Sequence, residues 1–227
     1  MSLLLTFHGH AAFSMSDGTD TIVIDPFLTG NPVAEAAGIT EASLSPTHIG
    51  LTHGHEDHIG DTVAIARRTN AEIIGAYEIC EWASGENGLQ RTNPGNPGGR
   101  VETSFGWVAF THAFHSSSYR GQYMGMACGL VVHMGDTTVY HAGDTDLFSD
   151  MKLIGELYTP DLAILPIGDR FTMGPALATT AAEWIAAPRA VPCHFNTWPP
   201  IEVDHTLFAP KGVDVTVLAA GESTEVG

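Results

Sequence analysis

Residues 53–58, with the sequence HGHEDH, bring three imidazoles and the carboxylate of Asp57 into six consecutive positions. Imidazole nitrogens and carboxylate oxygens are the donors that borderline divalent ions such as zinc prefer. A polar loop that only caps a following helix would need Asp57 alone, so the three added histidines favour metal binding. One ion could not be reached by all four side chains without strain. The motif therefore predicts two neighbouring ions.

Four more candidate side chains follow expected strands elsewhere in the chain, and these are Asp25, His115, Asp144 and His194. Loops at strand ends are where α/β proteins place their binding and catalytic residues. His112 competes with His115, but a ligand in the loop after a strand fits better than one at the strand's end. We therefore expect His115 to face the ions, and His112 to lie behind the ligands or beside the pocket.

The elements that must position these residues alternate between strands and helices in both halves of the chain. Strands are expected at residues 3–7, 11–15, 21–24, 48–51, 72–75, 107–111, 126–134, 137–141, 162–165, 190–193 and 213–218. Helices are expected at residues 59–69, 77–83, 147–158 and 175–187, with a long surface loop at residues 85–100. Two strand groups suit two packed sheets with helices outside, although layer rules also allow other α/β folds.

Length and charge limit the classes of function. A chain of 227 residues with 44% apolar residues is expected to form a single domain, residues 1–227, with a large core. Its 26 acidic residues against nine basic ones give a net charge of −17, which repels polyanions and disfavours a nucleic-acid substrate. Most of these acids are expected simply to keep the surface soluble. A small molecule is the expected substrate.

The cysteines and the N-terminus bear on location. Cys80, Cys128 and Cys193 are odd in number and widely spaced, which fits reduced thiols and no disulfide framework. The apolar start of the chain is short and lacks basic residues, so it resembles a first strand more than a signal peptide. No apolar run approaches the ~20 residues needed to span a bilayer. We expect a cytoplasmic protein that does not enter the membrane.

The ordered series of Asp25, the HxHxDH motif, His115, Asp144 and His194 resembles the five motifs of the metallo-β-lactamase superfamily. This resemblance covers most of the chain and implies a four-layer αββα sandwich, with two mixed sheets and helices outside. It implies that the first ion is held by His53, His55 and His115. It implies that the second ion is held by Asp57, His58 and His194. By the same resemblance Asp144 bridges the ions, and Asp25 supports the histidine loop from behind the ligands.

Finer motifs are similar to a small group of metal-dependent hydrolases related to ascorbate-6-phosphate lactonase. They lie at residues 9–13 (GHAAF), 111–117 (THAFHSS), 166–175 (PIGDRFTMGP) and 192–197 (PCHFNT). Other branches fit less well. Penicillin-cleaving enzymes usually lack the acid at Asp144, and diiron flavoproteins place Glu where this chain has His55. The spacing from Asp144 to His194 leaves no room for the inserted domain of RNA-cleaving branches, and the short remainder after His194 leaves none for a glyoxalase-type helical domain.

The resulting prediction is a hydrolase that uses a bridging hydroxide at a dinuclear site to attack an ester, lactone or similar bond. Zinc is the expected metal, and manganese, iron or nickel also suit these donors. Asp57 is expected to carry a proton as well as bind an ion. His10 and Asp169 are candidates for assisting the leaving group, and a structural role for each stays equally open.

Several alternatives also stay open. One is a phosphodiesterase acting on a small nucleotide or phospholipid-type substrate, and another is a mononuclear iron oxygenase of the same fold. A non-catalytic metal-binding module is disfavoured, because structural zinc sites are usually closed by four ligands. Residues 116–118, all serine, are expected to form the loop rather than to react. Phe171 and Met173 are interpreted as core residues, with the lining of an apolar pocket as the alternative. The sequence does not decide whether the protein is a homo-oligomer.

Overall fold

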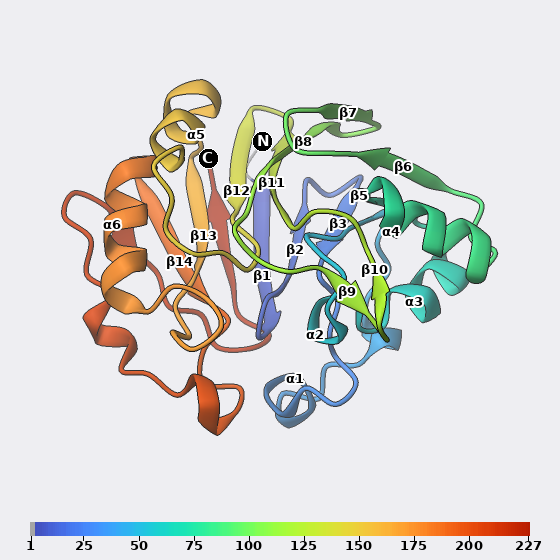
Figure 1. The fold of residues 1–227 in the computed structure, drawn as a ribbon, viewed down its shortest axis with the longest axis horizontal. Helices are drawn as coiled ribbons and strands as arrows, with labels where there is room; N and C mark the ends of the chain where they lie inside the picture. Colours follow the sequence, from blue (N-terminus) through green and yellow to red (C-terminus); the bar gives the residue numbers. More distant parts are fainter. Residues whose placement is uncertain (1–2) are drawn as a thin grey trace.

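Two seven-stranded sheets lie face to face, with helices on their outer sides, in the computed structural model, which describes residues 3–227. Figure 1 shows the four layers from left to right as helices α5 and α6, the second sheet, the first sheet, and helices α3 and α4. The expected αββα arrangement is therefore confirmed.

The first sheet has the strand order β16-β1-β2-β3-β4-β5-β6. Its strands are β1 (Leu3–Gly9), β2 (Ala12–Ser16), β3 (Thr21–Ile24), β4 (His48–Gly50), β5 (Glu72–Ala76), β6 (Thr92–Gly95) and β16 (Ser223–Val226). Pairing is antiparallel from β16 through β3 and parallel from β3 through β6, so the sheet is mixed.

The second sheet repeats this design in the order β15-β14-β13-β12-β11-β8-β7. Its strands are β7 (Arg100–Thr103), β8 (Gly106–His112), β11 (Cys128–Met134), β12 (Thr137–His141), β13 (Leu162–Pro166), β14 (Arg189–Cys193) and β15 (Asp214–Val215). Strands β7, β8, β11 and β12 pair antiparallel with their neighbours, and β12, β13, β14 and β15 pair parallel.

The main core fills the space between the two sheets. Leu5 and Phe13 from the first sheet pack in one cluster with Val108, Leu130 and Ile164 from the second. Strands β12 and β13 are buried along their whole length, because one face meets this core and the other meets the helices. The near-continuous apolar composition of these strands follows from burial on both faces.

The helices cover the outer faces. Those beside the first sheet are α1 (Pro32–Ala36), α2 (Glu56–Ile59), α3 (Thr62–Thr69) and α4 (Tyr77–Glu81). Those beside the second are α5 (Met151–Tyr158) and α6 (Pro175–Ile185), which contact each other and share a second core cluster. Shorter turns are η1 (Glu41–Ser43), the π-helical η2 (Trp82–Glu86), η3 (Pro199–Ile201) and η4 (His205–Leu207). No helix within residues 3–227 is long and apolar enough to cross a membrane.

The structure differs from the sequence-based expectation in several segments. The expected helix at residues 59–69 is interrupted at Gly60, where φ is +40° and a Cβ would lie 2.4 Å from the Pro26 carbonyl oxygen. The expectation of a long loop at residues 85–100 was wrong, because β6 lies within this segment and pairs parallel with β5. Strand β16 and the small hairpin of β9 (Ser118–Tyr119) and β10 (Gln122–Tyr123) were not expected. Their short polar sequences carry no alternation that marks a strand.

One edge of the sandwich collects the carboxyl ends of the strands that precede the candidate residues. Strands β3 and β4 run parallel in the first sheet, and β8, β12 and β14 run in one direction in the second. Their following loops carry Asp25, residues 53–58, His115, Asp144 and His194. The topology therefore brings five distant segments to the same edge.

Candidate metal centre

The histidine loop follows β4 and is pinned beneath the β9–β10 hairpin. A Cβ on Gly54 would lie 2.3 Å from the Cβ of Met124, so only glycine allows the loop to pack this closely. The Gly54 amide donates to the Ser117 hydroxyl oxygen at 3.1 Å. These contacts hold the peptide between His53 and His55 against the hairpin, and so fix where both imidazoles point.

Three imidazoles form the first donor group, which consists of His53, His55 and His115. Nε2 of His53 lies 2.9 Å from Nδ1 of His55. The other ring nitrogen of each also has a partner, since the Thr52 hydroxyl lies 3.0 Å from His53 Nδ1 and the Ser116 hydroxyl lies 3.2 Å from His55 Nε2. Such partners fix the ring orientation and tautomer of a ligating histidine.

A second donor group contains His10, Asp57, His58 and His194. Nδ1 of His58 lies 2.7 Å from Oδ2 of Asp25, and both side chains are fully buried. Asp25 also accepts hydrogen bonds from the Thr52 amide at 2.9 Å and from its hydroxyl at 2.6 Å. One buried carboxylate thus steadies histidines of both groups, through His58 directly and through Thr52 beside His53.

Asp144 lies between the two groups. Its Oδ2 is 3.1 Å from His194 Nε2 and 3.5 Å from His115 Nε2, and its Oδ1 is 3.4 Å from His58 Nε2. It also forms a third donor group with His53 and His58. Histidines of both groups therefore converge on one carboxylate.

The donor atoms fit divalent ions. Three of them, His58 Nε2, His194 Nε2 and Asp144 Oδ1, are buried and lack a hydrogen-bond partner among residues 3–227. Buried polar atoms normally find partners, because leaving them unpaired is costly. Nitrogen and carboxylate donors that converge without other partners are the arrangement that a divalent ion satisfies.

The electrostatics of the two groups differ. Burial lowers the pKa of His53, His55 and His115, so these imidazoles remain neutral and keep a lone pair to donate. Burial also disfavours protonation of His194, but the Asp144 carboxylate outweighs it and raises the pKa of His194 to about 9. The pKa of His58 is raised for the same reason. Positive charge beside Asp144 is thus favoured, whether protons or a divalent ion supply it.

Three residues of the centre have strained backbones. His10, Asp25 and His194 have φ values of +59°, +46° and +53°, in the left-handed region that is costly for residues other than glycine. The His194 amide donates to the His10 carbonyl oxygen at 2.7 Å, which ties two of these turns together. Strain of this kind persists only where surrounding contacts enforce it, and here it aims the side chains inward.

His10 contacts Asp57 directly. Its Nε2 lies 3.1 Å from Asp57 Oδ2, and its Nδ1 lies 2.9 Å from the Thr197 hydroxyl. The His10 side chain is almost fully buried, and burial together with His194 lowers its pKa to about 4. Burial alone would raise the pKa of Asp57, yet His58 and the hydrogen bond from His10 hold it far below its usual range. Asp57 is therefore an ionised carboxylate in a fixed position.

The structure separates the sequence-based candidates. Asp25, the four motif side chains, His115, Asp144, His194 and His10 come together, whereas His112 is exposed and belongs to no donor group found in residues 3–227. Asp169 is also exposed, its carboxylate lies beside Gly174, and it belongs to none of the donor groups found in the described residues. Thr52 and Ser116 were not predicted as partners of the histidines, since a single hydroxyl next to a histidine has no distinctive spacing.

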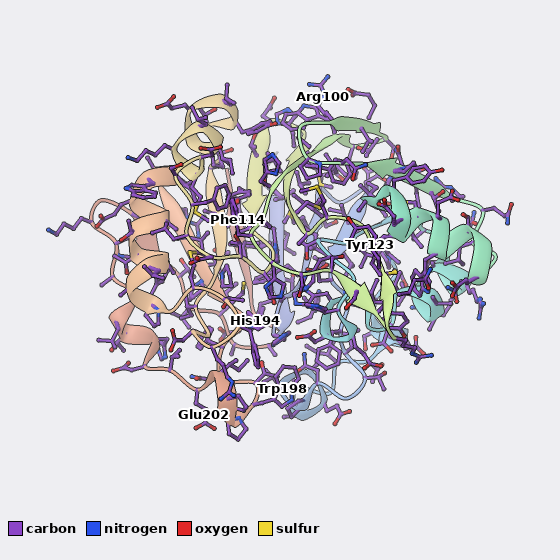
Figure 2. The ribbon with its side chains drawn as sticks, viewed as in Figure 1. Arg100, Phe114, Tyr123, His194, Trp198 and Glu202 are labelled. Atoms are coloured by element: carbon purple, nitrogen blue, oxygen red, sulfur yellow. The ribbon has the colours of Figure 1, made fainter. Side chains whose placement is uncertain are left out.

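The donors open into a hollow of about 320 Å³, which we call the metal hollow. It is lined by His55, Asp57, His115, Ser116, Asp144, Phe171, His194 and Trp198. Phe171 is 57% exposed, so the expectation that it packs in the core was wrong, whereas Met173 is fully buried as expected. Figure 2 labels His194 near the middle of the molecule and Trp198 close to it.

Comparisons with known proteins agree with this arrangement. A model of the beta-lactamase superfamily domain matches residues 20–195. A metal-dependent hydrolase of the UPF0173 group from Shouchella clausii is 47% identical over 98% of this chain and 99% of its own length. A second from Geobacillus thermodenitrificans is 46% identical over 98% of this chain and 99% of its own.

A solved structure supports the same assignment. Igni18, a metallo hydrolase from Ignicoccus hospitalis, is 34% identical and superposes with a TM-score of 0.88 over 99% of this chain and 98% of its own. The resemblance inferred from the motifs is thereby confirmed. The chain belongs to the beta-lactamase superfamily, within the UPF0173 group of metal-dependent hydrolases.

Proposed function

We propose that this hydrolase works with two divalent ions and cleaves an ester or lactone bond of a small molecule. One ion would be held by His53, His55 and His115. The other would be held by Asp57, His58 and His194. Asp144 would be shared, and zinc is the metal that this histidine-rich set suits best.

The observation that carries this proposal is the position of Asp144. Its Oδ2 lies within 3.5 Å of a histidine nitrogen from each group, so one carboxylate can serve both ions. A structural zinc site would be closed by four ligands and would need no second group of donors. Two donor groups joined by one carboxylate and opening into a hollow favour a catalytic pair.

The chemistry supplied by two bound ions would be a water of lowered pKa, as nucleophile, and a polarised electrophile. The chain's own residues supply the rest. Asp57, held ionised beside His10, can bind an ion and accept a hydrogen bond that orients the attacking water. His10 acts as a positioning residue, because its two ring nitrogens tie Asp57 to Thr197. Asp169 is left out of this proposal, because its exposed carboxylate is not among the residues that line the metal hollow.

An uncharged bond suits the metal hollow better than a phosphodiester does. Among its lining residues there is no lysine or arginine to pair with a phosphate oxygen. Phe171 and Trp198 instead supply apolar walls, which exclude water from the reacting centre. In the described hollow the phosphodiesterase alternative therefore has only the proposed ions, and no cationic side chain, to contact a phosphate.

The test combines metal content with substrate screening. Purified protein is loaded with zinc, manganese or iron, and the bound metal is measured by plasma mass spectrometry. The same samples are then screened with p-nitrophenyl carboxylic esters, γ- and δ-lactones, thioesters and bis-p-nitrophenyl phosphate. We expect about two ions per chain and hydrolysis of esters or lactones. Chelation should abolish the activity, and added metal should restore it.

Two outcomes would contradict the proposal. A fully loaded protein that cleaves the phosphodiester but no ester or lactone would assign the alternative bond. A protein that binds one iron and consumes oxygen during turnover would be an oxygenase. The His10→Gln variant tests the positioning role, since the proposal requires altered metal occupancy or a shifted pH profile with little change in KM.

A further inference from the structure

A second hollow, of about 360 Å³, borders the metal hollow. It is lined by Ala113, His115, Ser116, Ser117, Ser118, Tyr123, Gly125, Met126 and Ala127, and we call it the apolar hollow. His115 and Ser116 line both spaces. A molecule seated over the donors can therefore extend into the second hollow without leaving the protein surface.

The outer walls of the apolar hollow are large side chains that face solvent. Tyr123 is 62% exposed and Met126 is 50% exposed. Phe171, at 57%, lines the adjoining metal hollow. Exposed apolar side chains scattered singly need no explanation, but a group of them around one concave surface is typical of ligand-binding sites.

The charges around the apolar hollow argue for an uncharged occupant. None of its lining residues is Lys, Arg, Asp or Glu. The chain as a whole carries 26 acidic residues and only nine basic ones. An anionic group in this hollow would lose water and gain no cation in return, and it would also face the acidic field of the protein.

The floor of the apolar hollow is fixed relative to the donors. Met124, beside Tyr123 in the chain, is fully buried and packs against Gly54 of the histidine loop. The Met124 amide donates to the Ser117 carbonyl oxygen at 3.2 Å, and the Ser117 side chain accepts from Gly54. The same contacts that hold the histidine loop therefore hold this wall, so the two hollows keep a constant spacing.

We propose that the apolar hollow binds an uncharged alkyl or aryl arm of the substrate, whose scissile bond lies over the donors. This inference rests on the proposed function and deepens it, since it names the substrate class as esters or lactones with an apolar substituent. Met126 and Tyr123 are then the residues that determine specificity for this arm.

A chain-length series tests the inference. The metal-loaded protein is assayed with p-nitrophenyl acetate, butyrate, hexanoate and octanoate. We expect kcat/KM to rise about threefold for each added methylene until the hollow is filled. The Met126→Ser and Tyr123→Ser variants should lower the octanoate-to-acetate ratio of kcat/KM by about tenfold or more. Leu157→Ser, at a 75% exposed position on α5, is the matched control and should keep the wild-type ratio.

A binding experiment separates this inference from the proposed function. The methyl ketones 2-butanone, 2-hexanone and 2-octanone are uncharged and cannot be hydrolysed. Calorimetric titration should show affinity that rises with chain length in wild type and not in Met126→Ser. If no ester is cleaved but the ketones show this dependence, the bond assignment fails and the hollow assignment stands.

Three results would overturn the inference. One is an equal octanoate-to-acetate ratio in wild type and both variants. Another is a preference for anionic over neutral arms of the same length. The third is a dimer that Met126→Ser dissociates without changing the ratio, as measured by sedimentation, because this would make the surface a subunit contact. Thermal unfolding and metal content of each variant verify that it folds, and Met126→Gln replaces any serine variant that does not.

Discussion

The donor centre differs in construction from the exposed apolar side chains beside it, which are Tyr123, Met126 and Phe171 and which we call the apolar rim. In the centre, His53, His58 and Asp144 are buried, and both histidines have a fixed partner behind the ring. On the rim, Tyr123 is 62% exposed and Met126 is 50% exposed. Positioning an ion requires fixed geometry, whereas contact with an apolar arm requires only area.

The centre also contains strained backbone. Strained φ values occur at His10, Asp25 and His194 in the centre, where costly conformations are held by neighbouring contacts. On the rim, Tyr123 ends the short β9–β10 hairpin, Met126 follows it, and Phe171 lies in a separate loop. We therefore expect substitutions in the centre to change metal content and stability, and substitutions on the rim to change substrate preference alone.

The largest effect is expected from Asp144→Asn. The amide keeps the shape but removes the charge that we propose both ions share, so metal content should fall and kcat/KM should drop on the order of a thousandfold. Asp146→Asn, two residues later in the same loop and exposed, is the matched control. Mass spectrometry of bound metal and ester hydrolysis measure both. Full metal occupancy in Asp144→Asn would show that the centre does not need this charge to bind its ions.

Asp25→Asn should come next. Its carboxylate accepts from Thr52 and contacts His58 at 2.7 Å without belonging to a donor group, so its loss should disorder the ring without removing a ligand. Partners of this kind are worth about 10–100-fold in metal affinity. Competition with a chelating dye measures the affinity, and Asp150→Asn at an exposed position provides the baseline. Equal affinities would show that the histidine loop holds its own geometry.

Acid should lower the unfolding stability of the protein through buried histidines that resist protonation. The rim has no histidine and should not contribute. Burial lowers the pKa of His8 from 6.5 to about 4. Between pH 6.5 and pH 4, His8 is therefore protonated in the unfolded chain and neutral in the folded one. Stability therefore falls as the pH drops from about 6.5 towards 4, by about 2 kcal/mol at pH 5 from this residue. Urea unfolding of the metal-free protein at pH 7 and pH 5 measures the difference. His8→Gln should reduce this difference, and an unchanged difference would assign the pH dependence to other groups.

The smallest effect is expected from Phe171→Ala on the wall of the metal hollow. Its ring is 57% exposed, so truncation should leave metal content and unfolding stability within about 0.5 kcal/mol of wild type. Ester hydrolysis should weaken by a few-fold, mainly through KM, because only apolar contact with the substrate is removed. Loss of metal in this variant would show that the rim also supports metal binding and does not affect substrate preference alone.

Much of the centre was predictable because its motif is local. Residues 53–58 carry four donors in one loop, and each remaining donor directly follows an apolar strand. The fold was predictable at the level of layers for the same reason, since strands such as β3 and β12 lie where the apolar runs predicted them. Strands β6 and β16 were missed because they are short, polar and half exposed, so nothing in their own sequence distinguishes them from loops.

The walls were not predictable. Phe171 is a residue type usually found in cores, and only the surrounding loops leave it facing solvent. Ser116 was expected only to form the loop, yet its hydroxyl lies 3.2 Å from His55 Nε2. Asp169 was a plausible acid in a favourable segment, but its side chain is exposed and lines neither hollow. Side-chain direction in irregular segments depends on packing with distant residues.

Residue types and local spacing were enough to identify which side chains could bind metal, because ligand chemistry depends on both. They also determined the alternation that produces two sheets. The family resemblance implied a shared role for Asp144, but its distances to histidines of both groups come only from the tertiary structure, as does the position of Met126 and Tyr123 in the adjoining hollow. Those relations join segments far apart in the chain, and they are set by how two sheets pack and where their strand ends meet.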